Sequence, residues 1–266
     1  MRRRRAGRAL LAALGLGLGL ALGGGVAPAR AQAPGQAALS ACPSLPPRSP
    51  MPRDATPDYL AEPTWRSRVA ELDRQIAAND MSRAQMVFLG DSLVQGWFPS
   101  IYQQFYAHRA AANLGVGGDF TQGLLARLAQ GHWPASLKPR LAVLLIGTNN
   151  IQYGGQPADV ALGIAEVVRF IRARSPQTRI LIIGLLPRGD TAAEPMRRNI
   201  AQVNALIARC ADQQHVFYTE PGPLLLDGQG RLSRDIAFDS LHLTMVGYAL
   251  LSAGIEPQIR QILAMP

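Results

Sequence analysis

Short apolar runs alternate with longer stretches of mixed polarity from residue 63 to the end of the chain. The runs predict strands at residues 85–89, 111–114, 141–146, 179–185 and 215–218. The longer stretches predict helices at residues 63–79, 93–105, 121–130, 159–174, 196–211 and 245–263. The runs at 141–146 and 180–183 contain no polar position, as strands covered by helices on both faces require. The pattern predicts a doubly wound (flavodoxin-like) three-layer α/β/α sandwich with a mainly five-stranded parallel sheet.

The first 62 residues follow a different pattern. Arginines among residues 2–8 precede an apolar stretch of Ala, Leu and Gly at 9–26, and the small residues of Ala29-Arg30-Ala31 follow it. This order predicts a signal peptide over residues 1–31. A transmembrane anchor is the alternative, but the glycines and the A-x-A site favour cleavage. Residues 32–62 are rich in Pro, Ala and Ser, and we interpret them as a linker or a segment wrapped over the domain at 63–266.

Export changes how the charge and the cysteines are interpreted. The mature chain is expected to be periplasmic or secreted, by the Sec or the twin-arginine route, and without a stable membrane span. Removing residues 1–31 takes away six arginines and no acidic residue, so the formal charge falls by six from +9 to +3. Nucleic-acid binding thereby loses its main support. In an oxidising compartment Cys42 and Cys210 can form a disulfide, but their spacing alone does not establish that they pair. Leu39-Ser40-Ala41-Cys42 also matches a lipobox, so lipoprotein anchoring through Cys42 is an alternative.

Three loops after predicted strands carry residues suited to chemistry, and ligands of such sheets bind at these strand ends. Gly90-Asp91-Ser92-Leu93 offers Ser92 as a nucleophile or as a helix cap. The glycines of residues 113–119 suit a backbone donor for an oxyanion or a tight turn, and they lack the spacing of a dinucleotide site. Gly147-Thr148-Asn149-Asn150 carries side-chain amides that are either oxyanion donors or turn residues.

A fourth loop, before the last predicted helix, holds Asp239 and His242 three residues apart. An aspartate that accepts a hydrogen bond from one ring nitrogen leaves the other nitrogen able to take a proton, and Ser, Asp, His is a known triad order. His108, His132 and His215 are weaker candidates, because none has a carboxylate at this spacing in a loop on the proposed active face. Two cysteines and four dispersed histidines predict no metal site.

These motifs resemble those of the SGNH, or GDSL, hydrolases. The similarity runs through N-L-G-V-G-G-D at 113–119, I-G-T-N-N at 146–150, G-L-L-P-R-G at 184–189, R-R-N-I-A-Q-V-N at 197–204 and D-S-L-H-L-T at 239–244. It covers residues 63–264, and within the family the chain resembles the catalytic subunits of brain-type platelet-activating factor acetylhydrolase. The resemblance implies Ser92 as nucleophile, His242 as general base and acid, and Asp239 as the residue that orients the histidine. It also implies an oxyanion hole formed by the Ser92 and Gly118 backbone N–H groups with the Asn149 amide.

The resemblance further implies a serine esterase that hydrolyses short-chain, in particular acetyl, esters through an acyl-enzyme on Ser92, with no cofactor. The predicted signal peptide, and not the resemblance, implies that this esterase is exported. The expected substrate is a small-molecule or carbohydrate ester. The brain-type relatives pair, which implies that a homodimer can form. The alternatives are an acyltransferase, lysophospholipase or thioesterase using the same triad, and a catalytically inactive carbohydrate-binding protein.

Overall fold

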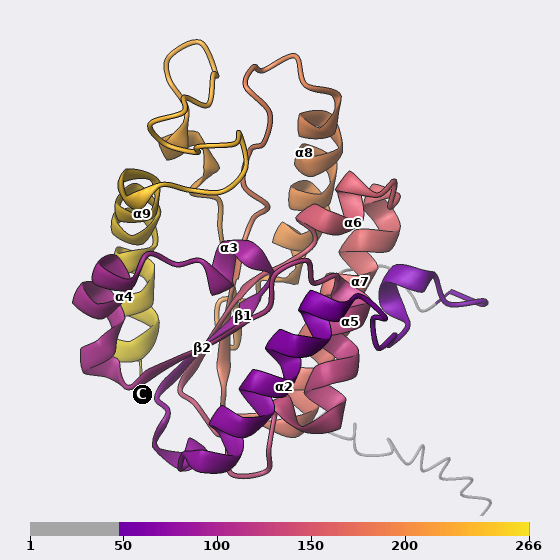
Figure 1. Cartoon of the computed structure of the whole chain (residues 1–266), viewed down its shortest axis with the longest axis vertical. Coiled ribbons are helices and arrows are strands. Elements are labelled where there is room, and N and C mark those ends of the chain that lie inside the picture. The colour runs from indigo at the N-terminus through magenta and orange to yellow at the C-terminus, as the bar shows by residue number, and fades with distance from the viewer. Residues whose placement is uncertain (1–47, 266) are drawn as a thin grey trace, which may run out of the picture. The chain divides into compact units, whose positions relative to one another are not determined.

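The computed structural model describes residues 48–265, and a sheet of five parallel strands lies at its centre (Figure 1). The strands are β1 (Met86–Gly90), β2 (Ala111–Gly115), β3 (Leu141–Leu145), β4 (Arg179–Ile183) and β5 (Val216–Thr219). They lie in the order β2-β1-β3-β4-β5, and every neighbouring pair is parallel. The predicted doubly wound α/β fold is therefore confirmed. The strand order reverses beside β1, which is where ligands bind in such folds.

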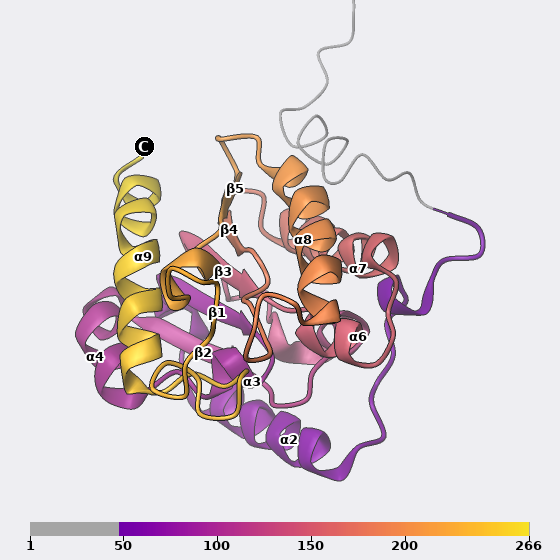
Figure 2. The ribbon, with the colours of Figure 1, turned by 90° about the horizontal axis from the view of Figure 1, so that it is seen from above.

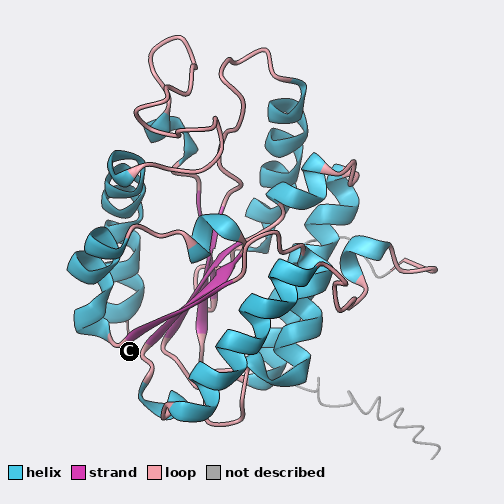
Figure 3. Cartoon of the chain, in the orientation of Figure 1, coloured by secondary structure: helices cyan, strands magenta, loops and turns pink. Residues whose placement is uncertain are grey.

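Helices cover both faces of the sheet, as Figure 2 shows from above and Figure 3 by colour. They are α2 (Pro63–Ala78), α3 (Ser92–Gln95), α4 (Pro99–Tyr106), α5 (Thr121–Arg127), α6 (Thr148–Gln152), α7 (Pro157–Arg174), α8 (Pro195–Ile207) and α9 (Met245–Ala264). Helices α4 and α9 cover one face, and α2, α5, α7 and α8 cover the other. The short helices α3 and α6 begin beyond the carboxyl ends of β1 and β3, so they position the loops that follow these strands.

The side chains of β1 explain why its sequence contains no polar position. Val87 and Leu89 belong to the hydrophobic cluster on one face of the sheet, whereas Met86 and Phe88 belong to the cluster on the other. All four side chains are fully buried. Successive residues of a strand point to opposite faces, so a strand covered on both sides has apolar residues throughout.

Two predicted elements differ from the structure. The helix predicted at 93–105 is split into α3 and α4, since Gly96 ends the first and Pro99 begins the second without a backbone N–H to continue the ladder. Between the two helices Trp97 turns into the core and is buried. The loop predicted at 147–150 is also wrong, because its last three residues form the first turn of α6.

Residues 48–62, the described part of the predicted linker, run along the domain; we call this segment the strap. The Thr121 hydroxyl donates to the carbonyl oxygen of Asp54 at 2.6 Å. The Asp58 N–H donates to the carbonyl oxygen of Gln122 at 3.1 Å. Leu60 is buried in the hydrophobic cluster that contains α2. The strap is thus attached to the start of α5, next to one of the loops expected to carry chemistry.

Several expectations concern residues 1–47, which lie outside the described residues. They include the signal peptide, the lipobox and Cys42, and with it the pairing of Cys42 with Cys210. Cys210 itself is fully buried in the 3₁₀ turn that follows α8. Within residues 48–265, no helix has both the length and the apolar character needed to cross a bilayer.

The turn after β1 joins the sheet to the expected nucleophile. Gly90 lies so close to β3 that a Cβ on it would be 2.0 Å from the carbonyl oxygen of Leu145. Asp91 caps α3, with its Oδ1 accepting the Leu93 N–H at 2.9 Å, so Ser92 is the first helical residue rather than the cap. The Asp91 Oδ2 is buried without a hydrogen-bond partner among the described residues. Burial raises the pKa of Asp91 to about 7.

Gly90→Ala is expected to lower the free energy of unfolding by about 3 kcal/mol or more, because the new methyl group collides with the backbone of a central strand that cannot move freely. Gly228→Ala is the matched control, since a Cβ on Gly228 meets no heavy atom within 4 Å. Chemical denaturation of both variants measures the difference. Equal denaturation midpoints would refute the close-packing explanation of Gly90.

The Asp91→Asn variant is expected to have a higher free energy of unfolding than the native protein, by an amount that grows as the pH rises. Folding raises the pKa of Asp91 from 3.8 to about 7, so stability is lost as the pH rises from the unfolded-state value through the folded-state value. The asparagine retains an acceptor for the Leu93 N–H and has no charge to bury. Between about pH 4 and pH 8, the difference in unfolding free energy should grow by as much as about 4 kcal/mol. Calorimetry that gives a difference independent of pH would contradict this expectation.

Candidate active site

Ser92, His242 and Asp239 lie together beyond the carboxyl ends of the strands, although 150 positions separate the serine from the histidine. The Ser92 Oγ is 2.8 Å from His242 Nε2, and His242 Nδ1 is 2.6 Å from Asp239 Oδ2. The other carboxylate oxygen, Oδ1, accepts the His242 backbone N–H at 2.7 Å. The carboxylate thus holds both the position and the tautomer of the ring, with the proton on Nδ1 and a lone pair on Nε2 facing the serine.

Contacts within the loop keep Asp239 ionised. Desolvation is the largest single influence on its pKa and raises it, but the hydrogen bonds and charge of His242, together with the Leu241 N–H, lower the pKa below its usual value. A carboxylate that is ionised at neutral pH stabilises an imidazolium when the histidine takes up a proton.

The segment that carries Asp239 and His242 is fixed at several points. The Phe238 N–H donates to the His242 carbonyl oxygen at 3.0 Å, and the Ser240 hydroxyl donates to the carboxylate of Asp190. Ser240 has a φ of 67°, in the left-handed region, which lets the loop turn tightly between the two site residues. The Phe238 ring stacks on the imidazole of His242 with centroids 5.9 Å apart. Packing and hydrogen bonds therefore set the orientation of the ring together.

The residues expected to donate to an oxyanion lie on neighbouring loops. Ser92 is the first residue of α3, where backbone N–H groups have no acceptor within the helix. A Cβ placed on Gly117 would be 3.9 Å from the Ser92 Cβ, so the glycine loop lies beside the serine. Gly118 has a φ of 72° and open space on its Cβ side. The Asn149 Nδ2 donates to the Asp119 carbonyl oxygen at 2.8 Å, which holds the amide and leaves one of its two N–H bonds for another acceptor.

A buried ion pair that the sequence analysis did not single out supports these loops. The Arg127 Nε lies 2.8 Å from Asp119 Oδ2, and both side chains are fully buried. The Trp65 indole N–H donates to Asp119 Oδ1 at 2.9 Å, and Arg127 Nη2 donates to the Gly90 carbonyl oxygen at 3.2 Å. Burial raises the pKa of Asp119, and the adjacent guanidinium opposes that effect. The only signal for this pair in the sequence was the final aspartate of the glycine block.

Arg188 is a second residue that the sequence analysis missed, apart from its place in G-L-L-P-R-G. Its side chain is largely buried, and Nη1 donates to the carbonyl and hydroxyl oxygens of Thr148 at 3.2 and 3.1 Å. Thr148 begins α6, so Arg188 holds the helix that presents Asn149. Desolvation lowers the pKa of Arg188, while the charges of Asp91 and Asp239 oppose that shift.

Within the described part of the chain, the three other histidines make no hydrogen bond to the expected site residues. His132 is buried with its Nε2 3.0 Å from the carboxylate of Asp73. Desolvation and the charge of Arg127 lower the pKa of His132 to about 4. His108 lies in the 3₁₀ turn after α4, and His215 precedes β5. From residue 48 to 265, no three His, Cys, Asp or Glu residues are arranged to hold a metal ion.

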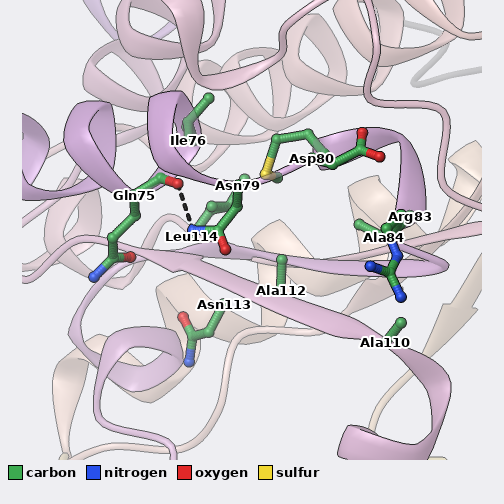
Figure 4. A pocket seen from close by; sticks show the side chains of 11 residues that line it. Gln75, Ile76, Asn79, Asp80, Arg83, Ala84, Ala110, Ala112, Asn113 and Leu114 are labelled. Atoms are coloured by element: carbon green, nitrogen blue, oxygen red, sulfur yellow. Dashed lines mark hydrogen bonds between the residues drawn. The ribbon is translucent and has the colours of Figure 1, made fainter.

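Two cavities have different relations to this site. One, of about 400 Å³, is lined by Gly118 and Asn149 and by residues of the strap. Another, of about 440 Å³, lies along the edge strand β2 beside the end of α2 (Figure 4). In that view the Asn79 amide donates to the carbonyl oxygen of Gln75, at the end of the helix. None of the expected site residues lines the second cavity, so the first is the one relevant to chemistry.

Comparison with known proteins identifies the family. The GDSL-like Lipase/Acylhydrolase family model matches residues 88–250, more than half of the chain. The human platelet-activating factor acetylhydrolase IB subunit alpha1 is 33% identical over 193 residues, covering 72% of this chain and 82% of the relative. The human alpha2 subunit is 36% identical over 183 residues, covering 67% of this chain and 77% of the relative.

Solved structures share the fold. A GDSL-like lipase from Bacteroides thetaiotaomicron VPI-5482 matches with a TM-score of 0.59 at 19% identity, covering 73% of this chain and 97% of the lipase. An acetylxylan esterase from Geobacillus stearothermophilus matches with a TM-score of 0.50 at 17% identity, covering 68% and 94% of the two chains. The resemblance seen in the motifs is thereby confirmed: the chain belongs to the GDSL-like lipase/acylhydrolase family and is a carboxylic ester hydrolase.

Proposed function

We propose that this protein is an exported serine esterase that hydrolyses short-chain, in particular acetyl, esters through an acyl-enzyme on Ser92. The observation that carries the proposal is the continuous series of hydrogen bonds from the Ser92 Oγ through His242 to Asp239. A serine hydroxyl is a weak nucleophile until a base within hydrogen-bonding distance accepts its proton. The ester hydrolase family of the chain supports the same chemistry.

Acylation begins when His242 Nε2 accepts the Ser92 proton as Oγ forms a bond to the ester carbonyl carbon. The carbonyl oxygen becomes an oxyanion, which the Ser92 and Gly118 N–H groups and the Asn149 amide stabilise. As the tetrahedral intermediate collapses, the bond to the alkoxy oxygen breaks, and the alcohol leaves with the proton from His242. The product of this half-reaction is an ester of the acyl group with Ser92.

Deacylation repeats these steps with water. His242 takes a proton from the water molecule as its oxygen bonds to the acyl carbon, and the same donors stabilise the second oxyanion. When the bond between that carbon and Oγ breaks, His242 returns the proton to Ser92 and the carboxylic acid is released. Asp239 keeps its negative charge throughout and stabilises the imidazolium in both half-reactions.

The acyl group and the location are argued from different observations. The names of the relatives, an acetylhydrolase and an acetylxylan esterase, support acetyl as the group removed. The basic start, apolar stretch and Ala29-Arg30-Ala31 of the sequence support export. An exported esterase meets small-molecule or carbohydrate esters in the periplasm or outside the cell. The resemblance to the brain-type subunits supports a homodimer as a form that the protein can adopt.

Ser92→Ala is expected to abolish hydrolysis of p-nitrophenyl esters, because the Ser92 Oγ is the group that attacks the substrate ester and without it no acyl-enzyme forms for water to hydrolyse. The native protein should cleave the acetyl ester faster than the octanoyl ester in a series of increasing chain length. Release of p-nitrophenol by the two purified proteins tests both statements. Equal rates for the native protein and Ser92→Ala would remove the serine esterase proposal, and a preference for octanoyl would remove the short-chain part alone.

Asn149→Ala is expected to lower kcat for p-nitrophenyl acetate by roughly 10²–10³ with little change in Tm, since it removes one donor to the oxyanion. Asn79→Ala provides the control, because Asn79 is exposed at the end of α2 and lies outside the site. Steady-state kinetics and thermal unfolding of both variants are compared. A kcat for Asn149→Ala equal to that of the control would exclude Asn149 from the mechanism.

A further inference from the structure

The strap is joined to the loops of the candidate active site by side chains that leave little freedom. The Asn150 Nδ2 donates to the Asp54 Oδ1 at 2.8 Å, and the Thr121 hydroxyl donates to the Asp54 carbonyl oxygen. A Cβ on Gly163 of α7 would lie 2.3 Å from that same carbonyl oxygen, so the strap packs directly on the helix. Asn150 follows the expected oxyanion donor Asn149, which couples the position of the strap to the site.

Two cavities adjoin one another along the strap. The cavity of about 400 Å³ next to Gly118 and Asn149 is also lined by Arg53, Phe120 and Tyr153. The other cavity, of about 300 Å³, is also lined by Arg53, Phe120 and Tyr153, and it lies between the strap and the start of α7. Because they share these three residues, we treat the two cavities as one path that begins beside Gly118 and Asn149. We call this path the strap cleft.

The lining of the strap cleft combines aromatic rings with charged groups. The rings of Phe120 and Tyr153 lie with their centroids 5.6 Å apart, and Tyr153 is 77% exposed. The Arg53 side chain is also mostly exposed, with the nearest carboxylate, that of Asp58, 3.9 Å away. Glu62 adds a carboxylate to the cavity that Gly118 and Asn149 line, and its Oε2 accepts the Thr64 hydroxyl and the Trp65 N–H at the start of α2. Aromatic rings pack on C–H groups and a guanidinium donates hydrogen bonds to hydroxyl oxygens, so this lining suits a ligand that has both C–H faces and hydroxyl groups.

The acetyl group proposed above is too small to occupy this cleft. An acetyl group has two carbon atoms, far fewer than a cavity of about 400 Å³ would hold. The alcohol portion of the ester is therefore the part that extends into it. A long alkyl chain would need a continuous apolar groove, whereas the charges of Arg53 and Glu62 interrupt this one. A pyranose ring packs its C–H face on an aromatic side chain and offers hydroxyl groups to guanidinium and carboxylate groups.

We propose that the strap cleft is a glycan-binding subsite that takes two or more sugar units of an acetylated oligosaccharide, with Tyr153 as the stacking platform and Arg53 as a hydroxyl-binding group. This inference rests on the proposed esterase function, because it assigns the leaving alcohol of that reaction. It adds to the site a segment, residues 48–62, that precedes the part matched by the family model.

The test compares acetate release from mono-O-acetylated saccharides of one and three sugar units, in glucose, xylose and N-acetylglucosamine series, with p-nitrophenyl acetate as the ester without a sugar. The native protein should show a kcat/KM at least tenfold higher for the three-unit substrate in at least one series. Tyr153→Ala should reduce that advantage about five- to tenfold, and Tyr153→Phe, which retains the ring, should restore it. Leu224→Ala is the control, because Leu224 is an exposed apolar residue outside the cleft.

The outcomes separate the two proposals. A native protein that cleaves p-nitrophenyl acetate but shows no preference for three sugar units in any series overturns the glycan subsite and leaves the esterase intact. The glycan subsite is also overturned if Tyr153→Ala lowers the preference for three sugar units no more than Leu224→Ala does. Higher activity on an acetylated glycerophospholipid than on every saccharide would assign the cleft to a lipid instead. A native protein inactive on all of these esters overturns the esterase proposal, and the subsite assignment with it.

Discussion

The ion pair between Arg127 and Asp119 connects the separate parts of the site. Both charges are buried, and each has a further partner: Arg127 binds the Gly90 carbonyl oxygen at the end of β1, and Asp119 accepts the Trp65 indole N–H from α2. The backbone of Asp119 also accepts the Asn149 amide. One pair of charges therefore fixes the ends of β1 and β2 and the first turn of α6 relative to one another.

This buried ion pair contributes more to the geometry of the site than to the stability of the fold. Two charges removed from water cost several kcal/mol each in solvation, and their attraction compensates only when every donor and acceptor is satisfied. Apolar residues in the same place would pack as well, but they would not hold backbone carbonyl oxygens at fixed points. The charges lie where three loops meet. A catalytic arrangement has to be held to within about 0.5 Å, and apolar contacts, being non-directional, do not provide that on their own.

The sequence predicted the parts of this protein that local pattern determines. Val87 and Leu89 face one cluster and Met86 and Phe88 the other, so β1 appears as an unbroken apolar run, and the same holds for the central strands. Ser92, Asp239 and His242 stood out as candidates because serine esterase chemistry requires these residue types, and the fold brings their side chains within hydrogen-bonding distance. The break between α3 and α4 was missed although Pro99 marks it, since the apolar spacing continues across the proline. Helix α6 was missed because five residues are too few for a helical period.

Residues that act through distant contacts could not be found in the same way. Arg127 contacts Asp119 and Gly90, and Arg188 contacts Thr148, each across a stretch of chain that no local pattern connects. The Pro- and Ala-rich sequence of the strap has no period, so it left open whether this segment is a linker or is wrapped over the domain. The bonds of Asp54 to Thr121 and Asn150 favour the second interpretation for residues 48–62. In each case the contact depends on the folded structure, so the residues next to it in the sequence do not reveal it.

The place of the strap has a consequence for how this enzyme can diversify. It belongs to no strand or long helix of the α/β domain, and it meets the domain at Asp54, at the Asp58 N–H and at the buried side chain of Leu60. Insertions or replacements elsewhere in the strap can therefore reshape the wall of the cleft while the sheet, the serine and the histidine keep their positions. The strap and the triad residues thus lie in separate stretches of the chain, so the part of the cleft wall that the strap forms can change at little risk to the residues expected to carry catalysis.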